Sequence, residues 1–513
     1  MLGAPEIRSA AAARRPRLVL LYAPCTVNKN FLHPCNPSVG YTPHLKHFAA
    51  GAVKFRDMQA ECGMSGACYA SIFTGCYGDR HEIFEQPGAL RDVLQITGTF
   101  SDGGYETFFW DGHPMASRRL NYGSGVKAGN SVENPLLADH PLFLSILKKL
   151  ASDPEYKAFI VTNFTVTHAI YMPPDLETLA AASGSGTVAD RLLESCGKDF
   201  WNLKVLPEEF EAARLTKAEF EKFNLLYQKQ QWMDIAYNFD GAMKRLDLAG
   251  DKKDKFIRTL NYLYKLNVAR LDLLFGMVVK RIEDSGLMDE SAVAFTADHG
   301  ETLYRDNTFF KYSHTYQLAP EVLSVPFLLK APGTGGGDFQ ATSRSVDIFP
   351  TLAALCGLKI EAGYRLDGTD LSPYIGGGKP PPRLLSYSHT ELISKMAEFG
   401  LRAVRADAAM RLFRVSNPDS IWLAVKDGKT VVKLEKRVLN GALELAAFDL
   451  ESDPEERKNF FNPSDPAHAA LRDELFAYKI RIVKAMEKTI RNPGPGVRRD
   501  EQLKKLKELG YVR

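Results

Sequence analysis

A chain of 513 residues with 45% apolar residues can bury a large core, and it has room for two domains or for one large domain with an appendage. Its 65 Lys and Arg nearly balance its 62 Asp and Glu, so the net charge of +3 supplies no basic excess for an obligate nucleic-acid partner. The seven cysteines are odd in number and include no Cys-x-x-Cys, which argues against a disulfide framework and for reduced thiols.

The apolar run at residues 17–23 predicts the first core strand. Because this run is far below the roughly 20 residues that span a bilayer, and no clean cleavage site follows it, we expect a soluble, cytoplasmic protein with no membrane span. Thr42-Pro43 predicts the start of a helix that Gly51 ends. Three later segments predict, in order, the end of a helix at 71–75 and strands at 104–110 and 157–164.

Residues 175–258 are charged and lack strand alternation, so we interpret them as a helical insertion. This insertion could cover the site or form a contact in a homo-oligomer. Apolar spacing from Tyr262 onward predicts a helix that stops at Gly286, and the apolar run 291–296 predicts a buried strand. The alternation of strands and helices predicts an α/β fold with a doubly wound sheet.

A Gly/Pro-rich linker at 376–382 separates this part from a strand-rich segment. Strands are predicted at 421–425, 430–434 and 443–450, and a helix near 466–490. The expected organisation is a catalytic domain at 15–375, a smaller C-terminal α+β subdomain at 383–492 and a charged tail at 493–513.

An acidic residue and a histidine follow the strand at 291–296, in the sequence Ala297-Asp298-His299-Gly300-Glu301. Open α/β sheets bind their ligands at the carboxyl ends of their strands, and a carboxylate with an imidazole suits a divalent cation. Asp and Gly are also common in turns, so the same residues could form only a strand-to-loop turn.

Six segments of the chain carry short motifs in a fixed order. They are Thr42-Pro43-His44-Leu45 with 48–55, Ala70-Ser71-Ile72-Phe73-Thr74-Gly75, Ala297–Glu301, 325–333, 346–352 with Leu366-Asp367-Gly368, and 448–454 with Glu456 and Asn459. Together they resemble the sulfatase-like branch of the alkaline phosphatase superfamily, over about Arg17 to Asn459. The resemblance implies a mixed sheet of the alkaline phosphatase and sulfatase type. Residues 312–321 and Cys62-Gly63 are also similar to segments of phosphoethanolamine transferases.

The resemblance also implies a nucleophile. The family's spacing, counted back from Thr74-Gly75, leads to Ser65, which in the family lies at a helix N-terminus beside a metal. There the backbone N–H groups and the helix dipole can bind an oxyanion, while the metal activates the hydroxyl. An ordinary N-cap serine is the alternative. Sulfatases convert a Cys or Ser in the pattern Cys/Ser-x-Pro/Ala-x-Arg to formylglycine, but Tyr69 replaces the Arg here, so we expect an unmodified Ser65.

The main departure from the family follows the first strand, where one or two acidic metal ligands are expected. Here Pro24-Cys25-Thr26 stands in that place, and no carboxylate occurs from Leu18 to Ser38. Cys25 could replace them as a thiolate, which would place Cys25, Asp298 and His299 around a divalent metal, with zinc favoured. Calcium or magnesium is disfavoured, since the oxygen ligands are too few. The alternative is a degenerate relative that has lost the metal.

Four further residues are similar to family positions that handle the substrate. His168 and His314 are candidates for catalysis, and Lys311 resembles the family's anion-binding lysine. His113 is a candidate for substrate binding. Each histidine could instead be a hydrogen-bonded structural residue.

These observations predict a soluble, metal-dependent hydrolase of phosphate or sulfate esters that acts on a small-molecule anionic ester through Ser65. A phosphoethanolamine-type transferase and a catalytically degenerate binding protein on the same fold are the two alternatives.

Overall fold

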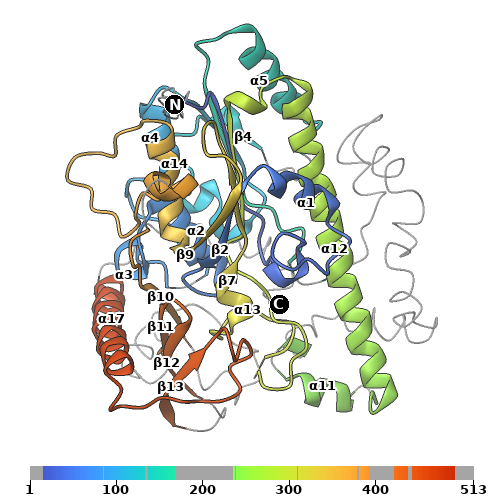
Figure 1. Ribbon diagram of the computed structural model, residues 1–513, viewed down its shortest axis with the longest axis vertical. Coiled ribbons are helices and arrows are strands. Elements are labelled where there is room, and N and C mark those ends of the chain that lie inside the picture. Colours follow the sequence, from blue (N-terminus) through green and yellow to red (C-terminus); the bar gives the residue numbers. More distant parts are fainter. Residues whose placement is uncertain are drawn as a thin grey trace, which may run out of the picture.

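The computed structural model describes the chain in several stretches that together contain two β-sheets and the helices that cover them (Figure 1). The described residues are 15–84, 86–132, 137–168, 171, 235–236, 238–245, 247–308, 310–377, 381–391, 421–436 and 442–491. The leader, most of the predicted insertion, Cys196 and the predicted charged tail lie outside these residues. None of the helices in the described residues is long and apolar enough to cross a membrane.

In the described residues the larger sheet has nine strands and mixes parallel with antiparallel pairs. Its strand order is β4-β3-β5-β1-β6-β8-β2-β7, with β9 paired to β2. The central strands β1, β5 and β6 are buried along their whole length, as expected for parallel strands covered on both faces. The strands are β1 Leu18–Tyr22, β2 Val53–Gln59, β3 Glu106–Trp110, β4 Ser131–Val132, β5 Ala158–Thr162, β6 Ser291–Thr296, β7 Ser324–Val325, β8 Phe327–Lys330 and β9 Gly337–Arg344.

Helices lie on both sides of this sheet, which confirms the predicted doubly wound α/β class (Figure 1). On one side are α1 (Pro43–Ala50) and α12 (Asp251–Asp284). On the other are α2 (Ser65–Thr74), α4 (Ile96–Asp102) and α14 (Ile348–Leu355). Further α-helices around the sheet in the described residues are α3 Gly78–His81, α5 Pro141–Ser152, α11 Phe239–Arg245 and α13 Pro320–Leu323.

The predicted start of the long helix at Tyr262 was wrong, because α12 already begins at Asp251, after Gly250 with φ 53°. Its first turns bury Phe256 and Leu260 against the core. These contacts are made with distant residues, so they stabilise helix in a stretch whose local charge pattern resembles an insertion. The helix ends near Gly286, which has φ 69° and terminates it as predicted.

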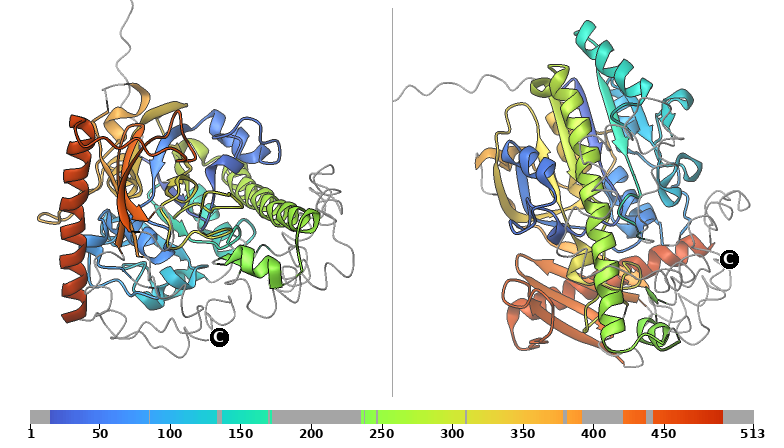
Figure 2. Two further views of the ribbon diagram at one scale, coloured as in Figure 1. Left: turned by 90° about the horizontal axis from the view of Figure 1, so that it is seen from below. Right: turned by 90° about the vertical axis from the view of Figure 1, so that its right-hand side faces the viewer.

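The smaller sheet is antiparallel, in the order β10-β11-β12-β13. Its strands are β10 Ser386–Glu391, β11 Ile421–Asp427, β12 Thr430–Lys436 and β13 Leu443–Asp449. Helix α17 (Pro466–Arg491) covers one face of the sheet, where Leu475 and Ile482 join its core. Figure 2 shows α17 and α12 on opposite sides of the molecule.

Candidate active site

Six predicted site residues follow strand ends or begin a helix at one edge of the large sheet. Cys25 follows β1, His113 follows β3 and His168 follows β5, while Asp298 and His299 follow β6. Ser65 is the first residue of α2. Because β1, β3, β5 and β6 run parallel, their carboxyl ends meet at this edge.

The structure brings Cys25, Ser65, Asp298 and His299 into direct contact. Ser65 Oγ lies 3.1 Å from His299 Nε2 and 3.4 Å from Cys25 Sγ. Cys25 Sγ lies 4.0 Å from His299 Nε2. All four side chains are buried, so the cluster is shielded from bulk water.

The hydrogen bond on the far side of His299 fixes which ring nitrogen carries the proton. His299 Nδ1 lies 2.9 Å from the carbonyl oxygen of Gly300, which can only accept, so Nδ1 donates. In the neutral ring Nε2 then keeps its lone pair and faces Ser65 Oγ. Burial lowers the pKa of His299, against the opposing effect of Asp298, which favours this neutral form.

Asp298 uses one carboxylate oxygen for structure, while the other accepts no hydrogen bond from the part of the chain that the structure describes. Its Oδ1 accepts from the N–H of His299 at 2.7 Å and from the N–H of Thr26 at 3.0 Å. Its Oδ2 is buried, has no hydrogen-bond partner among the described residues, and lies 3.4 Å from His299 Nε2. Thr26 has φ 57°, an uncommon conformation for a β-branched residue, which shows that the turn after Cys25 is tightly constrained.

This geometry fits a divalent cation. Ligand atoms of Cys25, Asp298 and His299 all lie within 4.8 Å of one another. The unpartnered Asp298 oxygen and the His299 lone pair are the kind of donors that a cation would satisfy. Burial, followed by the charge of Asp298, raises the pKa of the Cys25 thiol well above its usual range, so a cation would bind with release of the thiol proton. One thiolate, one imidazole and one carboxylate together form a donor set for a divalent cation.

Cys25, His113 and His168 also lie close enough to hold a cation, but His113 is unsuited to ligation. Its Nδ1 accepts from the backbone N–H of Met115 at 3.1 Å, so the proton of the neutral ring must be on Nε2. Burial and the neighbouring histidines, of which His168 has the largest effect, lower the pKa of His113 well below its usual range. The ring is therefore neutral, with Nε2–H as a donor instead of a ligand.

Because His113 Nε2 is buried and has no hydrogen-bond partner in the structure, it is a donor that lacks an acceptor. Such a group fits the oxygen of a bound anion. The N-terminus of α2 offers further donors, since the N-cap residue Met64 forms no side-chain capping bond. An oxyanion at this place would meet both sets of donors.

The remaining histidines pack beside this cluster. The rings of His299 and His314 stack with centroids 4.4 Å apart, and the ring centroids of His168 and His314 are 5.0 Å apart. Burial lowers the pKa of His314 to about 4, with Asp298 opposing this effect. His314 Nδ1 lies 3.3 Å from both carboxyl oxygens of Glu301.

Glu301 is a residue to which the sequence assigned no separate role, although it closes the Asp298 motif. It is fully buried, and burial raises its pKa to about 8, with the nearby His299 opposing the shift. Its position in the motif was a signal in the sequence, but its pairing with His314 depends on a contact between separate loops.

The structure does not place Lys311 with the histidines. Its ammonium donates to the carbonyl oxygens of Arg305, Asp306 and Thr308, at 3.2 Å for Asp306 and 2.5 Å for Thr308. Burial lowers its pKa to about 8. These contacts use the Lys311 donors inside its own loop, so we do not assign it the predicted anion-binding role.

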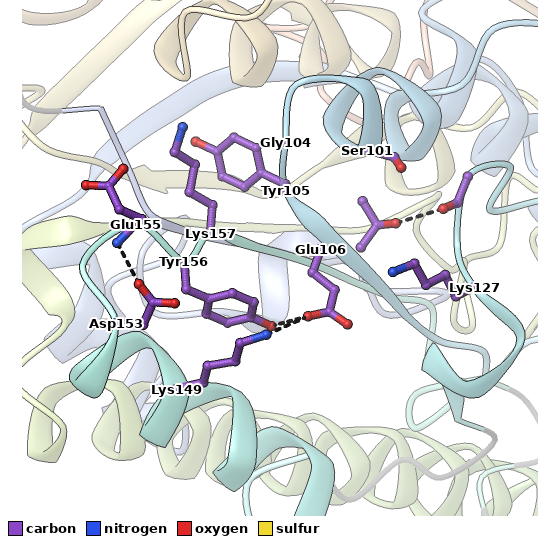
Figure 3. Close-up of a pocket in the computed structure, with 12 residues that line it drawn as sticks. Ser101, Gly104, Tyr105, Glu106, Lys127, Lys149, Asp153, Glu155, Tyr156 and Lys157 are labelled. Carbon is purple, nitrogen blue, oxygen red and sulfur yellow. Dashed lines mark hydrogen bonds and ion pairs between the residues drawn. The ribbon is translucent and has the colours of Figure 1, made fainter.

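A separate hollow of about 560 Å³ lies at the amino-terminal ends of β3 and β5, at the opposite edge of the sheet (Figure 3). It contains none of the predicted site residues. Within it, Glu106 accepts from the Tyr156 hydroxyl at 2.8 Å and pairs with Lys149 at 3.4 Å. The hollow therefore does not contribute to the site.

Comparisons with known proteins agree with this fold. A family model described as Sulfatase matches residues 35–358. The multifunctional alkaline phosphatase superfamily protein PehA of Trinickia caryophylli is 29% identical over 218 residues, which cover 42% of this chain and 38% of that protein. This chain thus matches well under two thirds of the length of PehA.

Two further proteins extend the comparison. The endo-4-O-sulfatase of Bacteroides thetaiotaomicron is 29% identical over 372 residues, covering 65% of this chain and 66% of that protein. The crystal structure of the phosphonate monoester hydrolase of Agrobacterium radiobacter superposes with a TM-score of 0.56 at 17% identity, covering 94% of this chain and all of that one (100%). At this identity the likeness extends to the fold alone.

Proposed function

Because this chain belongs to the sulfatase family, we propose that it is a divalent-metal-dependent hydrolase of sulfate or phosphate esters that acts through Ser65. Hydrolysis of such esters is supported by the relatives, which include an endo-4-O-sulfatase and the alkaline phosphatase superfamily protein PehA. The enzymes of the family depend on a metal ion. The free thiols of the six described cysteines are compatible with a reducing compartment such as the cytoplasm.

The observation that carries the proposal is the position of Ser65 Oγ, 3.1 Å from His299 Nε2 and 3.4 Å from Cys25 Sγ. This hydroxyl stands at the N-terminus of α2, beside the unpartnered oxygen of Asp298. A cation held by Cys25, Asp298 and His299, with zinc favoured, would lower the pKa of the Ser65 hydroxyl.

The protein groups account for the other parts of the reaction. Ser65 Oγ attacks the sulfur or phosphorus, so that its new bond forms as the bond to the ester oxygen breaks. His113 Nε2–H and the backbone N–H groups at the start of α2 bind the non-bridging oxygens. The neutral ring of His314, whose Nδ1 faces Glu301, donates a hydrogen bond from Nε2 to the leaving oxygen, and His168 lines the same space. Water then hydrolyses the ester on Ser65.

An unmodified Ser65 is part of the proposal, because Tyr69 stands where sulfatases that carry formylglycine have arginine. Mass spectrometry of the peptide that contains Ser65 tests this point. We expect the mass of unmodified serine, and a peptide lighter by two hydrogens would contradict it.

The proposal as a whole is tested by metal analysis together with a Ser65→Ala variant. We expect about one bound cation per chain and, in the variant, loss of ester hydrolysis with the fold retained. Ser145→Ala, on the exposed face of α5, is a matched serine control and should keep full activity. A metal-free wild type without ester hydrolysis would favour a non-catalytic protein on the same fold, whereas full activity in Ser65→Ala would remove Ser65 as the nucleophile.

A further inference from the structure

Tyr69 connects the nucleophile helix to the strand that delivers Cys25. It lies four residues after Ser65 in α2, so both side chains project from the same face of the helix. The Tyr69 hydroxyl donates to the backbone carbonyl of Ala23 at 2.8 Å. Tyr69 is fully buried, so no water competes for this hydrogen bond.

Ala23 belongs to the short segment that leads from β1 to Cys25. The N–H of Ala23 donates to the carbonyl of Thr162 at 3.3 Å, and the N–H of Cys25 donates to the carbonyl of Phe164 at 2.7 Å. These bonds tie the segment to the exit of β5, while Tyr69 ties it to α2. The Tyr69 hydroxyl therefore links the segment that leads to Cys25 with the helix that carries Ser65.

The Tyr69 ring also borders His113. The two ring centroids are 5.6 Å apart, with 54° between the planes. The Tyr69 side chain thus contacts the segments that carry Cys25 and His113, and it projects from the same helix as Ser65. Burial raises the pKa of the Tyr69 hydroxyl well above its usual range, so it remains a neutral donor.

We propose that Tyr69 is a positioning residue that holds the Cys25 thiol opposite Ser65 and thereby sets the affinity of the site for its cation. This inference rests on the proposed function, because it assumes that Cys25 is a ligand. It assigns a role to the residue that takes the place of the arginine in the formylglycine pattern. Tyr69, which replaces that arginine and so argues for an unmodified Ser65, would thus also support the Cys25 thiolate that replaces the missing carboxylate.

The test compares Tyr69→Phe with Tyr122→Phe. Tyr122 is a matched control because it is also buried and its hydroxyl donates to a backbone carbonyl of α2, that of Gly66, at 2.7 Å. It does not bridge α2 to the Cys25 segment. Both variants lose one hydroxyl and keep the ring, so both should fold.

The primary measurement is zinc affinity by competition with a chromophoric chelator. Changes in groups that orient metal ligands cost about 10–100-fold in affinity, and we expect a loss of this size in Tyr69→Phe and no comparable loss in Tyr122→Phe. With cobalt as the probe, the thiolate-to-metal absorption band should weaken or shift in Tyr69→Phe alone. The activity of Tyr69→Phe should recover when free zinc is raised, while Tyr122→Phe, which loses a similar buried hydroxyl, should need no extra zinc.

Equal zinc affinity in the two variants would overturn the role of Tyr69 and leave the proposed function intact. A wild-type protein that binds no zinc or cobalt would overturn both.

Discussion

His299 Nε2 faces Ser65 Oγ at 3.1 Å, while its other ring nitrogen donates to the carbonyl of Gly300. The backbone therefore selects the tautomer that turns a lone pair toward the serine. His113 shows the opposite arrangement, because its Nδ1 accepts from the N–H of Met115 and its Nε2 must donate. The two histidines thus have different chemistry, one as an acceptor or ligand and the other as a donor to an anion.

Replacement of Cys25 should change which cation binds. Cys25→Ser removes the thiolate ligand. Loss of a group that only orients a ligand costs about 10–100-fold in metal affinity, so we expect zinc affinity to fall by more than this in Cys25→Ser. Cys25→Asp adds a carboxylate and should shift the preference toward magnesium or calcium. Cys35→Ser, a half-buried thiol that is not part of the site, is the control and should bind zinc like the wild type. Unchanged zinc affinity in Cys25→Ser would remove the thiol from the ligand set.

His113→Asn separates the two functions of His113. The asparagine oxygen can still accept from Met115, but the donor at Nε2 is lost, so kcat should fall by about 10²–10³ with little change in thermal stability. His140→Asn is the matched control, since His140 caps α5 in the same way through its Nδ1. If both variants retained full activity, His113 would be no more than a helix cap.

The charge of the substrate should matter to the site. The neutral rings of His113 and His314 and the engagement of Lys311 in its own loop leave few positive groups for a dianion. We therefore expect monoanionic esters, such as 4-nitrophenyl sulfate or methyl 4-nitrophenyl phosphate, to exceed 4-nitrophenyl phosphate in kcat/KM by about tenfold or more. Steady-state kinetics at pH 8 tests this, and a preference for the phosphate monoester would contradict it.

Glu61 should make the stability of the protein depend on acid pH. It is buried, and burial alone would raise its pKa, but His81, His389 and Ser71 outweigh this effect and lower the pKa below its ordinary 4.5. The ionised Glu61 carboxylate therefore stabilises the fold at pH values above its unfolded-state pKa. This stabilisation is lost as the pH falls through the lower pKa of the folded state. Glu61→Gln should cost about 3 kcal/mol at pH 7 and less at pH 3, as measured by denaturant unfolding. An equal loss at both pH values would contradict this.

Local sequence patterns were sufficient to predict several of the regular elements. The apolar run at residues 291–296 coincides with β6, and the predicted strands and final helix of the C-terminal part agree with β11, β12, β13 and α17 within a few residues. Strand alternation and helical spacing are properties of neighbouring residues, so one sequence is enough to read them. The start of α12 was missed because its first turns are stabilised by packing with distant residues.

The candidate site was predicted only in part, because local patterns identify residues but do not show contacts between distant segments. Cys25, Ser65, Asp298 and His299 could be proposed from motifs and spacing, and the structure brings them together. The tautomers of the histidines, the loop that engages Lys311 and the bond from Tyr69 to Ala23 depend on contacts across the fold. A linear pattern carries no record of such contacts. The domain boundaries stay predictions.

X-ray absorption at the metal edge of the purified, zinc-loaded protein tests the central claim most directly. The account predicts one sulfur ligand at about 2.3 Å together with nitrogen and oxygen ligands at about 2.0–2.2 Å. The sulfur signal should disappear in Cys25→Ser. A bound zinc surrounded only by nitrogen and oxygen in the wild type, or a protein that takes up no zinc, would contradict it.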